Sequence, residues 1–393
     1  MFDSTISDAE NKFISYLPKT NSYYSNKRNF SFDPETNENT TSLLSPYIRY
    51  RVLSEEKILN KVLNIHSFSK VEKYVQEIFW RTYWKGWLEH RPDVYSDYLI
   101  DKNNLYDDFK NNKYYLNAIN GKTDLSFFNS WVNDLKNNGY LHNHIRMWFA
   151  SIWVFTLKLP WQLGADFFMQ NLLDGDPASN TLSFRWVSGI QTKGKNYIAR
   201  KVNIEKYSNI KFKDNEILNE NAEALYENKE YRINKIAIYE TPKIKEIKHI
   251  IIPTDELNIL KDLKVSNCSI FSGYPVKDYN DHSFSEKIHN HIINLTRSCF
   301  NDDIYYKDFH IKISFESYFE DLNKWIYENN IKEIYLPYVS QGNWKKIYKK
   351  IIKKYANINF IKFNRKYDIN SWIYSKKGYF KFKQYIPELI KDL

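Results

Sequence analysis

The stretch that decides the fold begins with GYLHNHIRM at 139–147, continues through an apolar run, and reaches LLDGDPASN at 172–180 shortly before Trp186. Taken as a helix, residues 143–153 have two distinct faces. Apolar residues recur at i, i+3, i+4, i+7 and i+8, which predicts a stripe buried in a core. The members of this stripe are Ile145, Trp148, Phe149, Ile152 and Trp153.

The other face of the same helix carries Asn143, Arg146 and Met147, so an amide, a guanidinium and a thioether project together. Two carboxylates, Asp174 and Asp176, follow at the corner before the next helix. Unpaired charge in apolar surroundings costs free energy, so these groups are expected to satisfy a buried polar partner.

These residues resemble the flavin-binding core of the photolyase/cryptochrome family, which holds FAD bent into a U inside a helical domain. Two earlier segments support the resemblance in matching order, TSLLSPYIR at 41–49 and EIFWRTY at 77–83. One such motif alone is a weak signal, whereas several in the same order over roughly half the chain are a strong one.

The resemblance implies a set of FAD-binding residues. The hydroxyl-rich turn 41–45 would grip the pyrophosphate, because free backbone N–H groups at a helix start bind anions. Arg146 and Asp174 would pair across the flavin, Asp176 would meet the polar edge of the ring, and Asn180 would lie at flavin N5. The full set is Tyr24, Thr41, Ser42, Leu43, Leu44, Ser45, Tyr74, Arg81, Asn143, Arg146, Asp174, Asp176 and Asn180. No metal site is predicted.

A second set is implied for DNA and its lesion. The residues expected to act in catalysis are Glu77, Trp80, Asn143, Met147, Asn180 and Trp186, and those expected to contact DNA are Arg28, Glu77, Trp80, Arg81, His144, Trp186, Lys193 and Lys195. Trp80 and Trp186 would sandwich the damaged pyrimidines, and Glu77 would hydrogen-bond them. Read without the resemblance, residues 24–30 are a polar loop and residues 193–201 a solvated charge run. His142 and His144 are expected on the helix surface or facing DNA, rather than as general acids.

The chain departs from the family pattern at several positions. Arg51 stands where a Phe-Gly turn is common, and is expected to alter the surface more than the pocket. Phe184 replaces the first tryptophan of the family's electron-hopping chain, Trp161 matches the second, and Ala118 replaces the third. Phenylalanine is far harder to oxidise than tryptophan, so the usual photoreduction route is predicted to be broken. Repair itself does not need that route once the flavin is reduced.

Length and composition bound the function. A chain of 393 residues is long enough for two domains. The net charge of +10 favours a polyanionic partner such as DNA, although a lysine-rich surface explains it equally well. Two cysteines offer no disulfide framework and exclude a four-cysteine iron–sulfur cluster. Without a leader or an apolar run of the ~18 residues a membrane span needs, we expect a soluble cytoplasmic monomer.

The rest of the chain is expected to divide as follows. Residues 1–20 form a short helix at best, 21–212 a helical FAD-binding catalytic domain, 213–245 a linker, and 246–393 a smaller α/β domain with a parallel sheet. Residues 91–120 are expected to be irregular. In the last part, strands are predicted at 249–253, 268–271, 309–313, 333–336 and 359–362, and helices near 283–297, 316–329 and 344–355. This part weakly resembles the domain that precedes the flavin domain in photolyases, where an antenna pigment often binds. Whether an antenna chromophore is present is open.

Residues 345–354 carry six lysines on two helix faces, expected to be a solvated basic face first and a guide for DNA second.

The preferred hypothesis is light-dependent repair of cyclobutane pyrimidine dimers by an electron from photoexcited reduced FAD. Asn143 and Met147 match the enzymes for this lesion, whereas enzymes for the (6-4) lesion would place two histidines there. The alternative is a cryptochrome-like photoreceptor that binds FAD and repairs nothing. A helical DNA-binding protein without flavin is a third interpretation.

Overall fold

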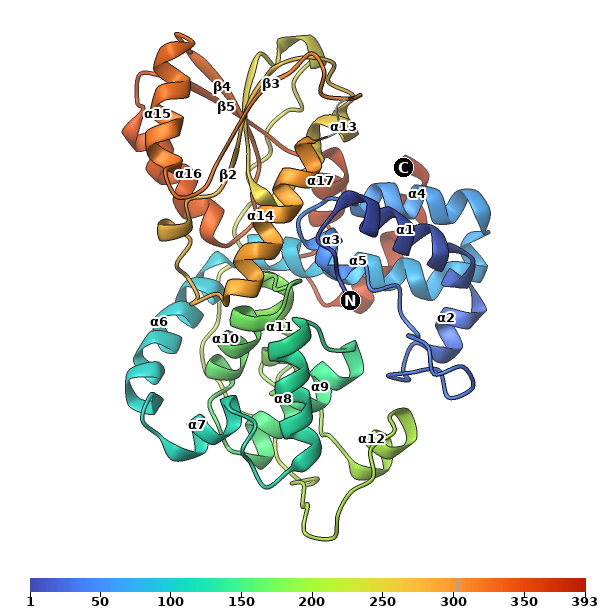
Figure 1. Cartoon of the computed structure of the whole chain (residues 1–393). Helices are drawn as coiled ribbons and strands as arrows, with labels where there is room; N and C mark the ends of the chain where they lie inside the picture. The colour runs from blue at the N-terminus through green and yellow to red at the C-terminus, as the bar shows by residue number, and fades with distance from the viewer. Residues whose placement is uncertain (302–303) are drawn as a thin grey trace.

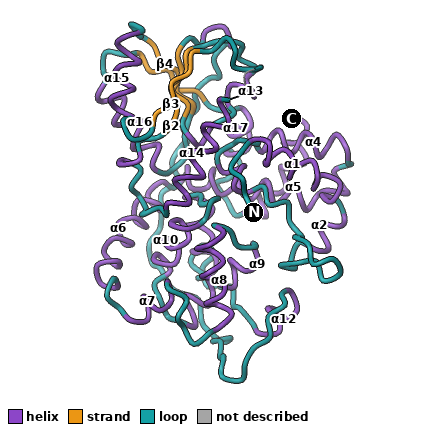
Figure 2. Tube along the Cα trace, in the orientation of Figure 1, coloured by secondary structure: helices purple, strands orange, loops and turns teal. Residues whose placement is uncertain are grey.

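The computed structural model of the chain describes residues 1–301 and 304–393. Helices make up the first part of the chain, and a parallel sheet with its own helices follows (Figures 1 and 2). The helices before the sheet are α1 (Ile6–Tyr16), α2 (Ser22–Lys27), α3 (Ser45–Arg49), α4 (Glu55–Ile65), α5 (Phe68–His90), α6 (Pro92–Phe109), α7 (Lys113–Ile119), α8 (Ser126–Asn138), α9 (Asn143–Ser151), α10 (Trp161–Asn171), α11 (Pro177–Val187) and α12 (Lys201–Tyr207). The expectation of irregular structure at 91–120 is wrong, because α6 and α7 span most of that range.

The turn into α9 is set by a glycine. Gly139 ends α8 in the left-handed region at φ 67°, and a Cβ there would lie 2.6 Å from the side chain of Leu173. A residue with a side chain would therefore be strained by both its backbone and its neighbour. Leu173 also donates its backbone N–H to the Gly139 carbonyl at 2.9 Å, which holds the start of α9 beside the carboxylate corner at 174–176.

The second part of the chain is a five-stranded parallel sheet in the order β3-β2-β1-β4-β5. Its strands are β1 (His249–Ile252), β2 (Ser269–Gly273), β3 (His310–Ser314), β4 (Glu333–Pro337) and β5 (Asn359–Phe363). Helices α13 (Ile259–Leu263) and α14 (Glu286–Phe300) lie on one side of the sheet, and α15 (Tyr318–Glu328) and α16 (Asn343–Lys354) on the other (Figure 1). The predicted combination of a helical part and a parallel α/β part is confirmed.

Three short helices after β5 return to the helical part: α17 (Lys366–Trp372), α18 (Tyr379–Phe382) and α19 (Ile386–Leu389). Helices α17 and α18 lie against α5, and the C-terminus ends near α4 (Figure 1). Thr82 of α5 shares a hydrogen bond of 2.9 Å with Tyr367, and Tyr379 donates to the Gln76 carbonyl at 2.7 Å. The sequence analysis did not predict this return.

Two hydrophobic cores hold the described chain together, and they meet at α5. The first unites residues 9–83 with the sheet and the C-terminal helices, and the second is formed within 88–218. Trp84 and Trp87 pack against both cores. The N-terminal helices thus share a core with the α/β part, and the predicted domain boundaries at 21–212 and 246–393 stay a prediction.

Arg51 corrects one expectation, because it lies in the interior and not at the surface. Its residue exposure is 2%, and its backbone adopts φ 50°, the left-handed region that glycine favours. Its guanidinium donates to Glu55 at 3.1 Å, to Glu256 at 2.5 Å and to Asp368 at 2.8 and 2.6 Å. Arg51 therefore ties the start of α4 to the segment after β1 and to α17.

The lysines of α16 also pair within the protein. Lys345 contacts Glu89 of α5 at 2.6 Å, Lys346 pairs with Asp281, and Lys350 contacts Asp278 at 2.5 Å. Three of the six lysines therefore join α16 to its surroundings, but all except Lys345 are exposed, as expected of a solvated basic face.

Cys268 and Cys299 are both free and buried. In the described part of the chain, no helix has the length and hydropathy to cross a membrane.

Candidate functional site

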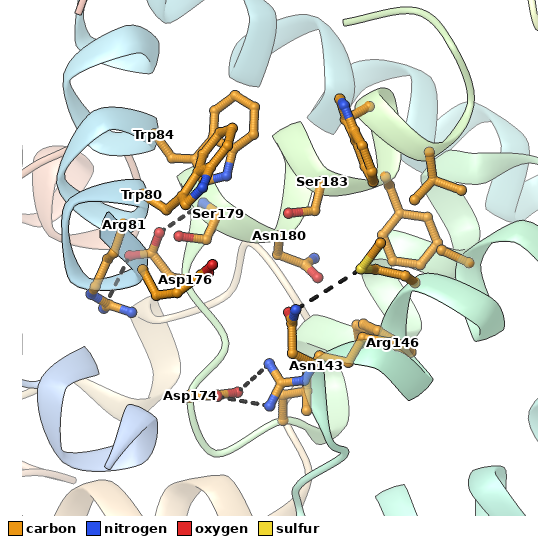
Figure 3. A pocket seen from close by; sticks show the side chains of 18 of the residues that line it. Trp80, Arg81, Trp84, Asn143, Arg146, Asp174, Asp176, Ser179, Asn180 and Ser183 are labelled. Carbon is orange, nitrogen blue, oxygen red and sulfur yellow. Dashed lines mark hydrogen bonds and ion pairs between the residues drawn. The ribbon is translucent and has the colours of Figure 1, made fainter. Parts of the chain in front are cut away.

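A cavity of about 530 Å³ lies between α5, α9 and α11, with the 174–176 corner at one end. Figure 3 shows the labelled side chains of these elements pointing into it from opposite sides. Twelve of the predicted site residues line this cavity: Arg28, Glu77, Trp80, Arg81, Asn143, His144, Arg146, Met147, Asp174, Asp176, Asn180 and Trp186. Motifs far apart in the sequence therefore meet at one site.

Helix α11 begins at the cavity. The Asp176 side chain accepts from the backbone N–H of Ser179 at 2.8 Å and caps the helix, and Pro177 occupies its first turn. Asp176, Ser179, Asn180 and Ser183 then fall on one face, as the spacing i, i+3, i+4, i+7 requires. The Asn180 amide donates to the Ala165 carbonyl at 2.7 Å, which fixes its orientation.

Helix α9 contributes the charged pair of the site. Arg146 donates to both carboxylate oxygens of Asp174 at 2.9 and 2.8 Å, and its Nε donates to the Leu141 carbonyl at 2.8 Å. Burial alone would raise the pKa of Asp174, but the Arg146 charge and its hydrogen bonds outweigh burial, and the net shift is downward. The expected pairing of Arg146 with Asp174 is present, and Figure 3 draws it beside Asn143.

Helix α5 presents Glu77, Trp80, Arg81 and Trp84 to the cavity. The Arg28 guanidinium lies 2.8 Å from a Glu77 oxygen, so these two residues contact one another. Burial nevertheless raises the pKa of Glu77 above its ordinary value. A neutral carboxyl can donate a hydrogen bond, which an ionised one cannot.

The Arg81 guanidinium lies near two carboxylates but forms few hydrogen bonds. Its nearest carboxylate oxygens belong to Glu55 at 3.4 Å and Asp176 at 3.6 Å. Its Nε and Nη2 are buried and form no hydrogen bond among the described residues. The same is true of the Ser179 hydroxyl in the opposite wall. These atoms are the unsatisfied polar groups of the cavity.

Both predicted tryptophans have neighbours of their own. Tyr379 of α18 stacks on Trp80 with ring centroids 3.4 Å apart and an interplanar angle of 12°. Trp84 packs on Trp80 at 5.3 Å, and Trp186 stacks on Tyr197 at 5.8 Å. One face of Trp80 is therefore covered in this structure.

Several predicted cofactor residues lie outside the cavity wall. Tyr24 and Tyr74 pack edge to face at 5.0 Å, and the Thr41 hydroxyl lies 3.3 Å from the Tyr140 hydroxyl. The turn predicted to grip a pyrophosphate, 41–45, includes Leu43 at φ 54°. The cavity residues and this turn are linked through Asp174, since Ser45 hydrogen-bonds that carboxylate.

His142 is buried and caps α9, accepting from the backbone N–H of His144 at 3.2 Å. Burial, with the charges of His144 and Arg146, lowers the pKa of His142 to about 3. The expectation of a surface or DNA-facing residue is wrong for His142, because its ring replaces a missing backbone acceptor at the helix start. His144 lines the cavity, stacks on Trp148 at 4.3 Å and lies 2.9 Å from the Asn29 carbonyl.

The residues at the three positions of the family's electron-hopping chain are buried. Phe184 is buried in the cavity wall, and Trp161 is buried beyond it and stacks on Tyr98 at 5.6 Å. Ala118 is fully buried. Lys193 and Lys195 are exposed, and Lys193 lies 3.5 Å from Glu230.

Sequence reasoning did not assign Ser179, Ser183 or Phe380 to the site. The two serines share the α11 face with Asn180, so helical spacing from that residue could have found them. Phe380 comes from α18, and no pattern in the sequence connects it to the cavity.

Comparison with known proteins finds similarity in the helical part. Residues 74–220 match the family described as the FAD binding domain of DNA photolyase. The deoxyribodipyrimidine photo-lyase of Buchnera aphidicola subsp. Baizongia pistaciae is 30% identical over 175 residues, which cover 43% of this chain and 36% of the relative. The enzyme of the same name from Alkalihalophilus pseudofirmus is 27% identical over 158 residues, 40% of this chain and 33% of the relative. The matches thus span about a third of these relatives.

Among solved structures, a bacterial class III photolyase from Agrobacterium tumefaciens is 24% identical with a TM-score of 0.44, covering 52% of this chain and 42% of that one. A cryptochrome of Synechocystis sp. PCC6803 is 18% identical with a TM-score of 0.40, covering 52% and 43%.

Proposed function

We propose, from the premise that the helical part of this chain belongs to the photolyase/cryptochrome family, that the protein binds FAD in the cavity and repairs cyclobutane pyrimidine dimers in DNA under light. The chain would act as a lyase on DNA.

The residues of the cavity fit a large polar cofactor. Its volume of about 530 Å³ lies in the range of ligand pockets, roughly 300–1,000 Å³. Buried polar groups without hydrogen bonds cost free energy, so Nε and Nη2 of Arg81, which have only long ion pairs of 3.4 and 3.6 Å, and the Ser179 hydroxyl favour a ligand with matching polar atoms. Arg146, Asp174, Asp176 and Asn180 would hold its ring, and the 41–45 turn its phosphates.

When bound and reduced, FAD supplies the light-excited electron that splits the dimer. The Arg146–Asp174 pair keeps its charges compensated, so this part of the wall is polar without carrying net charge. Asn180 is oriented by its bond to Ala165 and presents its amide oxygen with a fixed geometry. Trp186 offers an indole to a pyrimidine, and burial raises the pKa of Glu77, which favours the protonated form that can donate to a pyrimidine carbonyl oxygen.

One observation carries the proposal. Glu77, Asn143, Met147 and Trp186, which the family resemblance assigns to the lesion, line the same cavity as the residues assigned to the flavin. Extruding a damaged dinucleotide costs only a few kcal/mol, and base–aromatic stacking of ~1–3 kcal/mol per base can offset much of it. A sensor without repair activity has no need of such residues.

A second candidate is a flavin-binding photoreceptor. It is favoured by the Tyr379 ring on one face of Trp80, since a covered indole cannot stack on a base through that face. Phe184 in the cavity wall marks a further divergence from the repair enzymes.

The test is to purify the protein, record its visible spectrum, and illuminate it with reductant and a dimer-containing oligonucleotide. We expect flavin absorption and a light-dependent loss of dimers. Flavin absorption with light-induced spectral changes but an unchanged number of dimers identifies the photoreceptor. A colourless protein that takes up no added FAD overturns both candidates.

A further inference from the structure

An exposed aromatic ring from the C-terminal helices lies at the cavity. Phe380 has 82% of its surface exposed and lines the cavity wall. Single exposed apolar residues are ordinary, and Tyr226, at 83%, is one that does not line this cavity. Phe380 differs because it extends a wall that already carries the rings of Trp80, Trp84 and Trp186.

The segment that carries Phe380 is firmly anchored. On one side of it, Tyr379 stacks on Trp80 at 3.4 Å and donates to the Gln76 carbonyl at 2.7 Å. On the other side, Phe382 is fully buried and packs on Tyr83 at 5.4 Å. The exposure of Phe380 is therefore imposed by buried neighbours.

The chain just before Phe380 is anchored by its backbone. Tyr83 donates to the Lys377 carbonyl at 2.9 Å, and Arg91 donates to the Lys376 carbonyl at 2.8 Å. These bonds leave the ammonium groups of both lysines free to reach solvent.

Four lysines lie within four positions of Phe380 in the sequence. Lys376, Lys377 and Lys381 are exposed, and none has a carboxylate partner among the described residues. Lys383, by contrast, lies 3.5 Å from Glu72. An exposed ring among unpaired lysines, at the edge of an aromatic cavity, matches a base with its flanking phosphates.

We propose that residues 376–383 form a nucleic-acid contact of their own, in which Phe380 stacks on an unpaired nucleobase next to the pyrimidine dimer held in the cavity. Lys376, Lys377 and Lys381 contact the adjoining phosphates. With one face of Trp80 covered by Tyr379, Phe380 supplies the free aromatic face on that side. This inference rests on the proposed DNA-repair function and adds an element that lies outside the matched range 74–220.

The experiment measures binding of FAD-loaded full-length protein to a dimer-containing duplex with 2-aminopurine beside the lesion. Phe380→Ala is expected to weaken binding about 5- to 150-fold and to reduce the change in 2-aminopurine fluorescence. Phe380→Trp should restore both, because it keeps a stacking face. The matched control is Tyr226→Ala, an equally exposed ring, which should change neither.

The lysines are expected to affect the salt dependence of binding, which the ring does not affect. Changing Lys376 and Lys381 together to Ala should reduce the slope of log K against log salt by roughly 1.4–1.8, whereas Phe380→Ala should leave the slope unchanged. Lys324 and Lys332, which are also exposed and lie outside the predicted basic face of α16, are the control pair.

The outcomes separate this inference from the proposed function. If the unaltered protein does not prefer dimer-containing over undamaged DNA, the proposed function fails and the inference fails with it. If that preference is present and Phe380→Ala binds as tightly as the unaltered protein, only the inference is overturned. If Phe380→Ala loses binding to vesicles of anionic phospholipid while its DNA binding is unchanged, the segment is a membrane contact and the inference is equally overturned.

Discussion

Two arginines share one carboxylate in the interior, and they differ in what surrounds them. Glu55 accepts from Arg51 at 3.1 Å through one oxygen, while its other oxygen lies 3.4 Å from Arg81. Every guanidinium nitrogen of Arg51 donates to a carboxylate. Two of the three nitrogens of Arg81 have no hydrogen-bond partner among the described residues.

The difference indicates two uses of buried charge. A guanidinium saturated by protein carboxylates stabilises the arrangement of the elements that supply them, and Arg51 joins α4, the β1 edge and α17 in this way. A guanidinium left partly unpaired in a cavity wall is available to a ligand. The carboxyl edge of β1 and β4 is where ligands usually bind in such sheets, and here Glu256 from that edge pairs with Arg51 and Arg365.

The largest expected effect is the loss of Arg51. Arg51→Met should lower the free energy of unfolding by about 3–5 kcal/mol, because it removes the one cation shared by three buried carboxylates, of which Glu256 keeps Arg365 and Asp368 keeps no ion-pair partner among the described residues. Urea unfolding monitored by tryptophan fluorescence measures this. Lys349→Met, at an exposed position of α16, is the control. A loss below about 1 kcal/mol would show that the network does not hold α4, the segment after β1 and α17 together.

The Arg51 network should also make the stability depend on pH, through Glu55. Burial alone would raise the pKa of Glu55, but the charges of Arg51, Lys85 and Arg81 lower it to about 2. The folded state therefore binds protons at Glu55 less readily than the unfolded state. Its contribution is present above an ordinary pKa of 4.5 and is lost as the pH falls from there towards 2.

The second effect concerns Arg81. Arg81→Met should cost less stability than Arg51→Met, because Glu55 keeps Arg51 and Asp176 keeps its helix cap. FAD affinity should nevertheless fall about tenfold or more, since hydrogen bonds to a charged group contribute about 1.5–3 kcal/mol. The flavin-to-protein ratio after titration of the apoprotein measures it. If Arg81→Met loses as much stability as Arg51→Met and still binds FAD fully, the two arginines do not differ in their use.

The sequence analysis predicted those parts of the fold that depend on local patterns. Short β-branched runs indicate the five strands, and helical spacing indicates the polar face of α9. Both patterns can be recognised within about ten residues of sequence. The cavity residues were predicted from the order of several motifs along the chain. That order relates residues far apart in the sequence, which helical or strand spacing does not.

The remaining features depend on contacts between distant residues. Arg51 meets partners 205 and 317 positions away, and without them an arginine at that position is most simply expected at the surface. Tyr379 and Phe380 reach the cavity only because α17 and α18 pack on α5. His142 illustrates a local failure, because a buried histidine cap and an exposed histidine have the same sequence context.

The third effect tests the lesion side of the cavity. Trp186→Ala should weaken binding to dimer-containing DNA by about 1–3 kcal/mol while FAD stays bound, because the indole would contribute a base stack. Competition binding against undamaged duplex measures the change, and the visible spectrum reports the flavin. Unaltered lesion binding would remove Trp186 from the DNA contact and favour the photoreceptor.

The smallest expected effect belongs to Glu77, the one acid in the cavity whose pKa burial raises despite a neighbouring guanidinium. Because the neutral form donates a hydrogen bond, lesion affinity should decline as the pH rises through the raised pKa of Glu77. The decline should be about fivefold, since a single hydrogen bond contributes about 1 kcal/mol. Glu77→Gln carries an amide donor at every pH, so its affinity should not depend on pH over that interval. Glu328→Gln, on the exposed face of α15, should retain the decline. A pH dependence that persists in Glu77→Gln would assign the titration to another group and leave Glu77 as the partner of Arg28 alone.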